Sequence, residues 1–285
     1  MAMPEYRFQL EVPGGCLSGR EWPVEHSRAS VAIAHGINEH IGRYTHVAEA
    51  LASAGYTVAG VDHLGHGLSA AGGQRTSNIR RFDTFVNDFL VLIDRLRTER
   101  PEPVVALGHS MGGLIATRAA LRAQDRLSAL VLSGPALKLP MHLTPFRLRI
   151  ALEVARLVPF LPAPTSVNDG LSRDPGVRER FRADPLCIHQ SVRMGIARQI
   201  YLLSEETRPR AHDMLLPLLV MHGAADQITD PEGSREFVAN ASSPDKEFVL
   251  WPEDEHEIFN ELDQQAVISR MINWLDLRFV ASGVR

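Results

Sequence analysis

The chain has 285 residues, of which 45% are hydrophobic and 22% are charged. This is the composition of an ordinary globular protein that can bury a large core, and it excludes a disordered chain. The 30 Lys and Arg residues are outnumbered by 34 Asp and Glu residues, and a net charge of −4 supplies no field to attract a polyanion. Nucleic acid is therefore not an expected partner.

The cysteine content and the N-terminal segment indicate in which cellular compartment the protein is expected. Cys16 and Cys187 lie too far apart in sequence to indicate a disulfide framework or a zinc knuckle. The N-terminal segment, MAMPEYRFQL, has no basic stretch followed by an apolar run, and nowhere does the chain reach the roughly 18 consecutive apolar residues of a membrane span. We therefore expect a cytoplasmic protein without an export signal or a membrane-spanning helix.

Short apolar segments bounded by Gly or Pro recur along the chain. The first, YRFQLEV at 6–12, alternates and is followed by Pro13 and two glycines, which predicts a strand and a turn at an antiparallel edge. The others are continuous apolar runs, typical of strands buried on both faces, at 31–34, 56–61, 104–108, 129–134, 218–223 and 247–251. Helical patterns lie between the runs. This alternation predicts an α/β protein whose ligands bind at the carboxyl ends of mostly parallel strands.

One helical pattern is especially regular. At 81–100 the apolar residues recur every three to four positions, and Pro101 follows directly. We expect a long helix there that packs one face on the sheet.

Residues 139–212 break the strand–helix rhythm. This stretch is rich in Pro and Arg and contains helical patterns but no convincing strand. We interpret it as a helical cap inserted between two parts of one core, residues 1–138 and 213–285. Within it, the segment RLRIALEVARLVPFLP at 147–162 is strongly apolar but carries several arginines. It is either a cap helix packed on the core or a face that transiently contacts a membrane surface.

The motif GHSMGG at 108–113 follows one apolar run directly and precedes a helical pattern. It is a GxSxG elbow, in which the flanking glycines permit a tight turn that exposes the hydroxyl of Ser110 above the sheet. A bare GxSxG is expected by chance in roughly one chain in ten of this length. The placement between a buried strand and a helix therefore carries the prediction of a nucleophile, against the alternative of a merely structural turn.

A serine nucleophile needs an imidazole to accept its proton and a carboxylate to orient that imidazole. In this kind of fold the acid and then the histidine follow the serine along the chain. His256 is the only histidine beyond residue 226, so it is the predicted base. Asp226, three residues after the run at 218–223, is the predicted acid. Asp230 is the nearest rival, and Asp254 and Glu255 are disfavoured because they lie so close to His256 in sequence.

Acyl transfer also needs N–H donors aimed at the developing oxyanion. The backbone N–H of Met111, at the start of a helix, is one predicted donor. The other is that of Ile37, in the loop HGINEH after the run at 31–34. No cofactor or metal is required. His63 and His66, three positions apart, are better explained by packing than by a metal pair because no third ligand is evident.

Several motifs resemble the monoacylglycerol lipase branch of the α/β-hydrolases, which includes bacterial lysophospholipase-like esterases. They are HGINEHIGRY at 35–44, DHLGHGLS at 62–69, GHSMGG at 108–113, SRDP at 172–175, DPL at 184–186, HGAAD at 222–226 and HEIFNE at 256–261. They span nearly the whole chain. One departure is WPEDEH, where the family usually has a YPGxxH-like form.

The resemblance implies an α/β-hydrolase fold, with a mostly parallel eight-stranded sheet, helices on both faces and a mobile helical cap over an acyl tunnel. It also implies a nucleophile at Ser110, an acid at Asp226, a base at His256 and oxyanion donors at Ile37 and Met111.

The predicted activity is hydrolysis of carboxylic esters through an acyl-enzyme, with monoacylglycerols as the first choice of lipid ester substrate. A lysophospholipase or general carboxylesterase is the alternative, and a non-catalytic ligand-binding protein of the same fold is a remote one. Dehalogenases and epoxide hydrolases are disfavoured because they use aspartate at the elbow.

Four further residues are candidates for the surroundings of the site. Glu39 and Arg43, four apart, either form a helical ion pair or help to hold the glycerol end of a substrate. His109, beside the elbow serine, is a candidate pocket-wall residue rather than the base. Cys187, in the predicted cap, is expected to be a small apolar filler near the tunnel.

Overall fold

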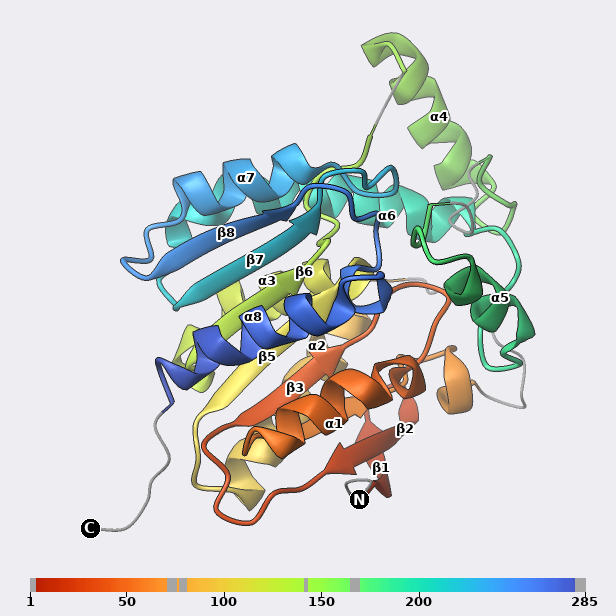
Figure 1. The fold of residues 1–285 in the computed structure, drawn as a ribbon. Coiled ribbons are helices and arrows are strands. Elements are labelled where there is room, and N and C mark those ends of the chain that lie inside the picture. The colour runs from red at the N-terminus through yellow and green to blue at the C-terminus, as the bar shows by residue number, and fades with distance from the viewer. Residues whose placement is uncertain (1–3, 71–75, 77–80, 141–142, 165–169, 280–285) are drawn as a thin grey trace.

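A computed structural model of the chain describes residues 4–70, 76, 81–140, 143–164 and 170–279. Its centre is an eight-stranded sheet in the order β1-β2-β4-β3-β5-β6-β7-β8 (Figure 1). The strands are β1 Tyr6–Val12, β2 Gly15–Trp22, β3 Ser30–Ala34, β4 Thr57–Val61, β5 Val104–His109, β6 Ala129–Ser133, β7 Leu218–Gly223 and β8 Lys246–Trp251. β2 pairs antiparallel with both β1 and β4, and the pairs from β4 to β8 are parallel. The predicted mostly parallel sheet is confirmed.

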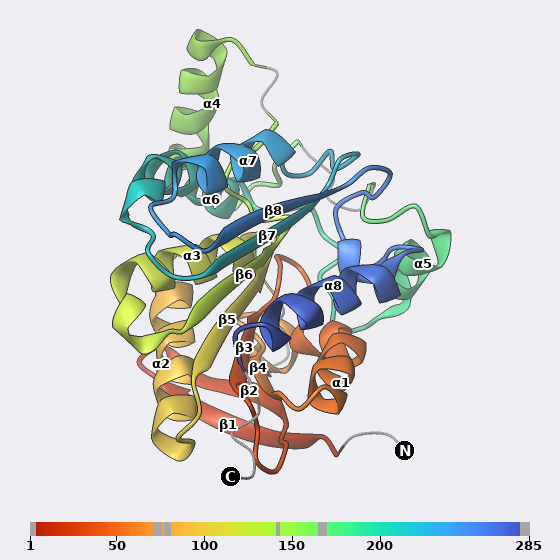
Figure 2. The same ribbon diagram turned by 60° about the vertical axis from the view of Figure 1, so that its left-hand side comes forward.

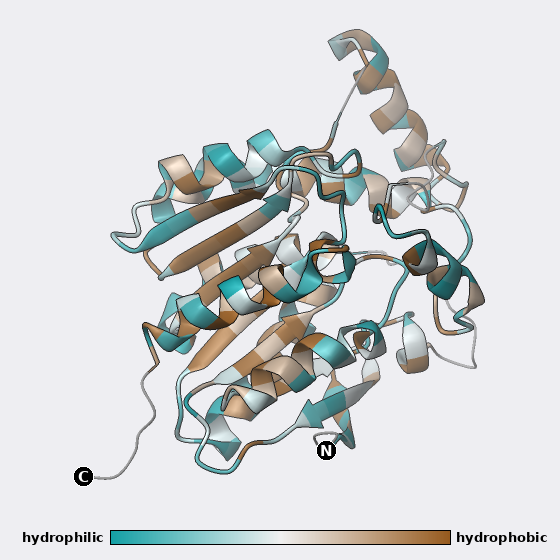
Figure 3. Cartoon of the chain, viewed as in Figure 1, coloured by the Kyte–Doolittle hydropathy of each residue, from teal (hydrophilic) through white to brown (hydrophobic). Residues whose placement is uncertain are grey.

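Five of the six continuous apolar runs of the sequence form buried strands, whereas the run at 247–251 forms the edge strand β8, whose residues are only partly buried because it has a neighbour on one side alone. Every residue of β3, β4, β5, β6 and β7 is buried, and Figure 3 shows the hydrophobic character of the central strands. The strand β2, which lies between β1 and β4, is not among those runs, because its residues GCLSGREW alternate buried and partly exposed positions and include small polar ones. Its register is set by the turn after β1, where Val12 pairs with Gly15.

Helices cover both faces of the sheet (Figure 2). The α-helices of this core are α1 Thr45–Ser53, α2 Asp83–Glu99, α3 Met111–Arg122, α7 Pro231–Asn240 and α8 Gln264–Asp276. Side chains of α2, α3 and α7 join one hydrophobic cluster, and side chains of α1 and α8 join a second cluster across the sheet. The predicted helix at 81–100 is confirmed by α2. The described residues also form the short 3-10 helices η1 Ile41–Tyr44, η2 Gly67–Ser69, η4 Gln124–Arg126, η5 Arg208–Asp213 and η6 Ile258–Asn260.

Helices also dominate the stretch between β6 and β7. It contains α4 Pro145–Leu157, α5 Pro175–Ala183 and α6 Met194–Thr207, and its described residues form no strand apart from one isolated bridge, Pro162 to Arg193. In both views α4 projects away from the sheet (Figures 1 and 2). The division into core and cap at residues 139 and 212 stays a prediction. None of the helices in the described ranges is both long and apolar enough to cross a bilayer.

The helix α4 is shorter than the apolar stretch from which it was predicted. It begins after Thr144, whose side chain accepts a hydrogen bond from the Arg147 N–H, and it ends at Leu157. Pro159 and Pro162 follow within five residues, and proline cannot continue a helix. The apolar residues at 158–162 therefore belong to the chain beyond the helix.

Asp88 is a buried carboxylate on α2 that has no hydrogen-bond partner on its Oδ2 atom. Burial raises the pKa of Asp88 to about 6. A carboxyl whose pKa is raised in the folded state stabilises the fold at pH values below its unfolded pKa. This stabilisation is lost as the pH rises through the folded-state pKa. The charged side chain is therefore a cost at neutral pH.

We expect Asp88→Asn to raise the free energy of unfolding by about 1 to 3 kcal/mol at pH 8 and to change it little at pH 4, because the substitution removes a buried, unpartnered charge. Urea denaturation at both pH values measures this. Asp125→Asn, at an exposed position, is the control and should leave the pH dependence unchanged. An equal effect of Asp88→Asn at both pH values would contradict this account.

Candidate active site

Ser110 occupies a sharp turn between β5 and α3. Its backbone has φ of 54° and ψ of −120°, a conformation that residues with a side chain rarely adopt. Two glycines make the turn possible: a Cβ on Gly112 would lie 2.0 Å from the Ala34 carbonyl oxygen, and one on Gly108 would lie 2.3 Å from the Gly112 carbonyl oxygen. The elbow motif thus has the strained geometry that its sequence predicts.

His256 and Asp226 form a hydrogen bond of 2.7 Å between Nδ1 and Oδ2. Both side chains are buried. Burial alone would lower the pKa of His256, but the charge and the hydrogen bond of Asp226 raise it. Burial alone would raise the pKa of Asp226, but His256 and a hydrogen bond from His222 hold it well below its usual range. The carboxylate is thus ionised and stabilises a protonated imidazole.

Further partners fix the Asp226 carboxylate from both sides. Its Oδ1 accepts hydrogen bonds from the backbone N–H groups of Ile228 and Thr229, and its Oδ2 accepts one from the Thr229 hydroxyl. His222 Nε2 lies 3.0 Å from Oδ2. Sequence reasoning missed the roles of His222 and Thr229, although the histidine stands in the HGAAD motif.

The rival acid Asp230 lies elsewhere. Its side chain caps the N-terminus of α7 by accepting from the Glu232 N–H at 2.9 Å, and it forms an ion pair with Lys138. Asp254, the other nearby acid, forms an ion pair with Arg173 at 2.6 Å. Among these acids, Asp226 is therefore the one that contacts His256.

Ser110 and His256 line one pocket together with Ile37. The Met111 backbone follows Ser110 directly at the start of α3, but its side chain is buried away from the pocket lining. In this conformation the structure shows no hydrogen bond between the hydroxyl of Ser110 and the ring of His256, both of which it describes; such contacts often tighten only when a ligand binds. The remaining lining residues are Gly36, Glu39, Arg43, His109, Leu171, Phe181, Ile228 and Glu257.

Three charged residues of this lining form a buried ion cluster, Glu39–Arg43–Glu257. Arg43 makes two hydrogen bonds of 2.7 Å to the Glu257 carboxylate and one of 2.9 Å to Glu39 Oε2. The predicted Glu39–Arg43 contact across four residues is thus present. Glu257, directly after His256, escaped sequence reasoning because its partner lies 214 positions earlier in the chain.

Glu39 also supports the loop that contains Ile37. Its Oε1 accepts a hydrogen bond of 2.5 Å from the Gly36 N–H and one of 2.7 Å from the Tyr44 hydroxyl. The carboxylate is buried, and both of its oxygens already accept hydrogen bonds from the protein. This leaves Glu39 better placed to fix the loop than to receive a new ligand hydroxyl.

His109 forms part of the pocket wall. Its ring centroid lies 4.7 Å from that of His256, and its Nδ1 lies 3.0 Å from the Ser133 carbonyl oxygen. Burial lowers the pKa of His109 to about 3, so the ring is neutral at physiological pH.

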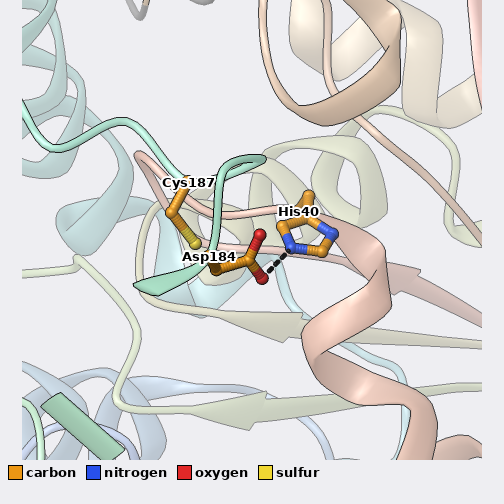
Figure 4. Close-up of side chains that lie close together, drawn as sticks. All are labelled: His40, Asp184 and Cys187. Atoms are coloured by element: carbon orange, nitrogen blue, oxygen red, sulfur yellow. Dashed lines mark hydrogen bonds and ion pairs between the residues drawn. The ribbon is translucent and has the colours of Figure 1, made fainter. Parts of the chain in front are cut away.

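His40, Asp184 and Cys187 bring three potential metal-ligating atoms within 4.8 Å of one another (Figure 4). Hydrogen bonds explain the contact without a metal. His40 Nδ1 accepts from the Gly42 N–H at 3.1 Å, so its Nε2 carries the ring hydrogen and donates it to Asp184 at 2.8 Å. The nitrogen that faces the carboxylate therefore has no free lone pair.

The loop of His256 is also held by residues between α4 and α5. The Glu257 N–H donates to the Leu171 carbonyl oxygen at 2.7 Å. Glu261, fully buried, accepts from the Arg173 N–H at 3.0 Å and from the Glu255 N–H at 2.8 Å. The SRDP and HEIFNE motifs thus meet in space, which the sequence alone does not reveal.

The model of the family described as serine aminopeptidase, S33, matches residues 25–263. The chain belongs to this family. A monoacylglycerol lipase of Mycolicibacterium smegmatis is 37% identical over 254 residues, which cover 89% of this chain and 90% of that protein. The predicted membership of the monoacylglycerol lipase family is thereby confirmed.

Two solved structures are similar over nearly the whole chain. The monoacylglycerol lipase of Paleococcus ferrophilus has a TM-score of 0.76 and 28% identity, with 96% of this chain and 98% of that chain covered. A soluble variant of the monoglyceride lipase of Saccharomyces cerevisiae has a TM-score of 0.84 and 24% identity, with 97% and 96% covered. With the sheet order, this likeness confirms the predicted α/β-hydrolase fold.

The contacts of Glu39 generate a prediction that separates loop support from glycerol binding. We expect Glu39→Ala to lower kcat by about tenfold or more for both a monoacylglycerol and a nitrophenyl ester of the same acyl chain, because the Gly36–Ile37 loop loses its anchor. Glu39→Gln keeps an acceptor for the Gly36 N–H and should lose less. Steady-state kinetics measures both. A loss confined to the monoacylglycerol would assign Glu39 to glycerol binding, whereas an unchanged preference between the two esters would remove that role.

Proposed function

We propose that this protein hydrolyses carboxylic esters, with monoacylglycerols as its main substrates, through an acyl-enzyme on Ser110. The observation that carries the proposal is the buried His256–Asp226 pair in the same pocket as a serine on a strained elbow. Asp226 orients His256, and His256 takes the serine proton. The backbone N–H groups of Ile37 and Met111 receive the developing oxyanion.

The reaction has two halves. In the first, the Ser110 oxygen attacks the acyl carbonyl carbon while His256 accepts the hydroxyl proton, and His256 then donates that proton to the leaving alcohol. In the second, a water molecule attacks the acyl-enzyme by the same route and releases the fatty acid. The raised pKa of His256 favours the protonated ring that exists between its uptake of the serine proton and its donation of that proton to the leaving alcohol.

The names of the relatives support an ester substrate, while the family description also names an aminopeptidase. The second candidate function is a lysophospholipase or general carboxylesterase. Apolar side chains on the pocket wall, Leu171, Phe181 and Ile228, favour an acyl chain over a peptide. All of these reactions use the same serine, so a panel of substrates separates them.

We also propose that residues 139–212 act as a cap and that α4 touches lipid surfaces. Phe146, Ile150, Val154 and Leu157 are exposed and follow helical spacing along α4, and Phe146 and Leu157 have exposed fractions of 74% and 68%. A run of exposed apolar residues beside arginines is typical of a helix that lies in a membrane interface. The cytoplasmic location stays a prediction.

The catalytic proposal is tested with a fluorophosphonate probe and a substrate panel. We expect the probe to label the wild-type protein and not Ser110→Ala, and His256→Ala to lower kcat by a factor of about 10³ or more, because the general base is lost. The panel contains monoacylglycerols, a diacylglycerol, a lysophosphatidylcholine, nitrophenyl esters and an aminoacyl anilide. Labelling that survives in Ser110→Ala would overturn the assignment, and a faster anilide reaction would favour the peptidase.

The surface proposal is tested by vesicle co-sedimentation. We expect the double variant Phe146→Ser and Leu157→Ser to bind vesicles about tenfold or more weakly than the wild type, because each exposed side chain loses its burial in lipid. Leu277→Ser removes an apolar side chain with an exposed fraction of 80% at the end of α8 and is the control. Equal binding by the α4 variant and the control would argue against a membrane role for α4.

A further inference from the structure

The Glu39–Arg43–Glu257 cluster contains more negative groups than positive ones. Two carboxylates share one guanidinium, so the cluster carries a net charge of −1 when all three groups are ionised. Burial raises the pKa of the Glu39 carboxyl, and the charge of Arg43 and the donors around Glu39 oppose that rise. Burial also acts to raise the pKa of Glu257, but its bidentate pairing with Arg43 lowers this pKa and favours the ionised form. All three side chains are nearly buried, and a charge at such a site acts over longer distances than in water.

The cluster lines the same pocket as His256. His256 has to reach the leaving oxygen to donate a proton, so the leaving group lies beside the imidazole. Glu257 is the next residue after His256 and lines the same pocket, as do Glu39 and Arg43. Whatever alcohol leaves is therefore exposed to the charge of the cluster.

The pocket offers no free cation to compensate an anionic group. Among the described residues of its lining, Arg43 is the one permanent cation, and both of its terminal nitrogens already donate to carboxylates. The Asp226 carboxylate behind His256 adds a further negative charge nearby. A phosphate on the leaving group would meet repulsion without the free guanidinium that usually binds it.

We infer that this cluster sets the charge selectivity of the pocket, which accepts esters with a neutral leaving group and rejects esters whose leaving group carries a phosphate anion. Glu257 is the specificity-determining residue, because it supplies the second negative charge. The inference rests on the proposed ester hydrolysis and extends it by placing neutral glycerol esters above anionic lysophospholipids.

The test compares two esters of one acyl chain below their micellar concentrations, lauroylglycerol and its 3-phosphate. We expect wild-type kcat/KM to be at least about tenfold higher for the neutral ester, and Glu257→Gln to reduce that ratio by about tenfold, mainly through the KM of the anionic ester. Gln keeps the size of the side chain and one acceptor for Arg43. Glu257→Asp should restore the wild-type ratio because it restores the charge.

Glu25→Gln is the matched control, since it removes one negative charge from an exposed side chain outside the pocket. It should leave the ratio unchanged. If Glu257→Gln does not fold, as thermal denaturation would reveal, Glu39→Gln takes its place, because it removes the other negative charge of the cluster and should reduce the ratio in the same way. Equal hydrolysis of both esters by the wild type overturns the inference, as does a ratio that Glu257→Gln leaves unchanged. A wild type that cleaves only nitrophenyl esters would instead contradict the proposed substrate class.

Discussion

The site depends on one steric constraint, the close approach of α3 to the end of β3. The Gly112 Cα lies so near the Ala34 carbonyl oxygen that no side chain fits between them, and this contact keeps Ser110 in its strained turn. A residue in such a conformation costs on the order of 1 to 3 kcal/mol, which the surrounding packing must offset. Because β3 and β5 are neighbours in the sheet, the loop after β3 is brought beside the serine. The strain thus fixes the hydroxyl and the Gly36–Ile37 loop relative to each other.

Charge is the second organising feature of the pocket. The ion cluster joins the loop after β3 to the loop after β8, which contains His256. Replacing a buried ion cluster by apolar residues often costs no stability, so the presence of this one is poorly explained by stability alone. Its position between the two loops that surround Ser110 suits a role in holding these loops in place and in setting the charge of the pocket. Glu39 anchors one loop, and Glu257 belongs to the other.

Local sequence patterns predicted the helices and strands. The rule that the acid and then the histidine follow the serine along the chain predicted the contact between Asp226 and His256. The buried strands β3 to β7 were visible because each is a short apolar run, whereas β2 was hidden by its small polar residues. The Ser110, Asp226 and His256 positions followed from motif and order. The partners of these groups did not: Glu257 acts through a contact with Arg43, 214 positions earlier, and the contacts of His222 and Thr229 with Asp226, although local, depend on how the loop after β7 folds. The length of α4 was overestimated because the apolar run continues past the residue at which proline ends the helix.

The two motifs that meet around Glu261 connect the histidine to the segment between α4 and α5. Backbone N–H groups of the His256 loop donate to carbonyl oxygens of residues 170 and 171, and the Glu261 carboxylate accepts from Arg173. The histidine is therefore held from two sides, by Asp226 in the core and by the segment between α4 and α5. The exposed apolar helix α4 belongs to the same stretch of chain, between β6 and β7. The same stretch also supplies apolar wall to the pocket, because Leu171 and Phe181 line it together with the buried carboxylates of Glu39 and Glu257. One stretch of chain therefore both supports the histidine loop and forms the apolar part of the pocket.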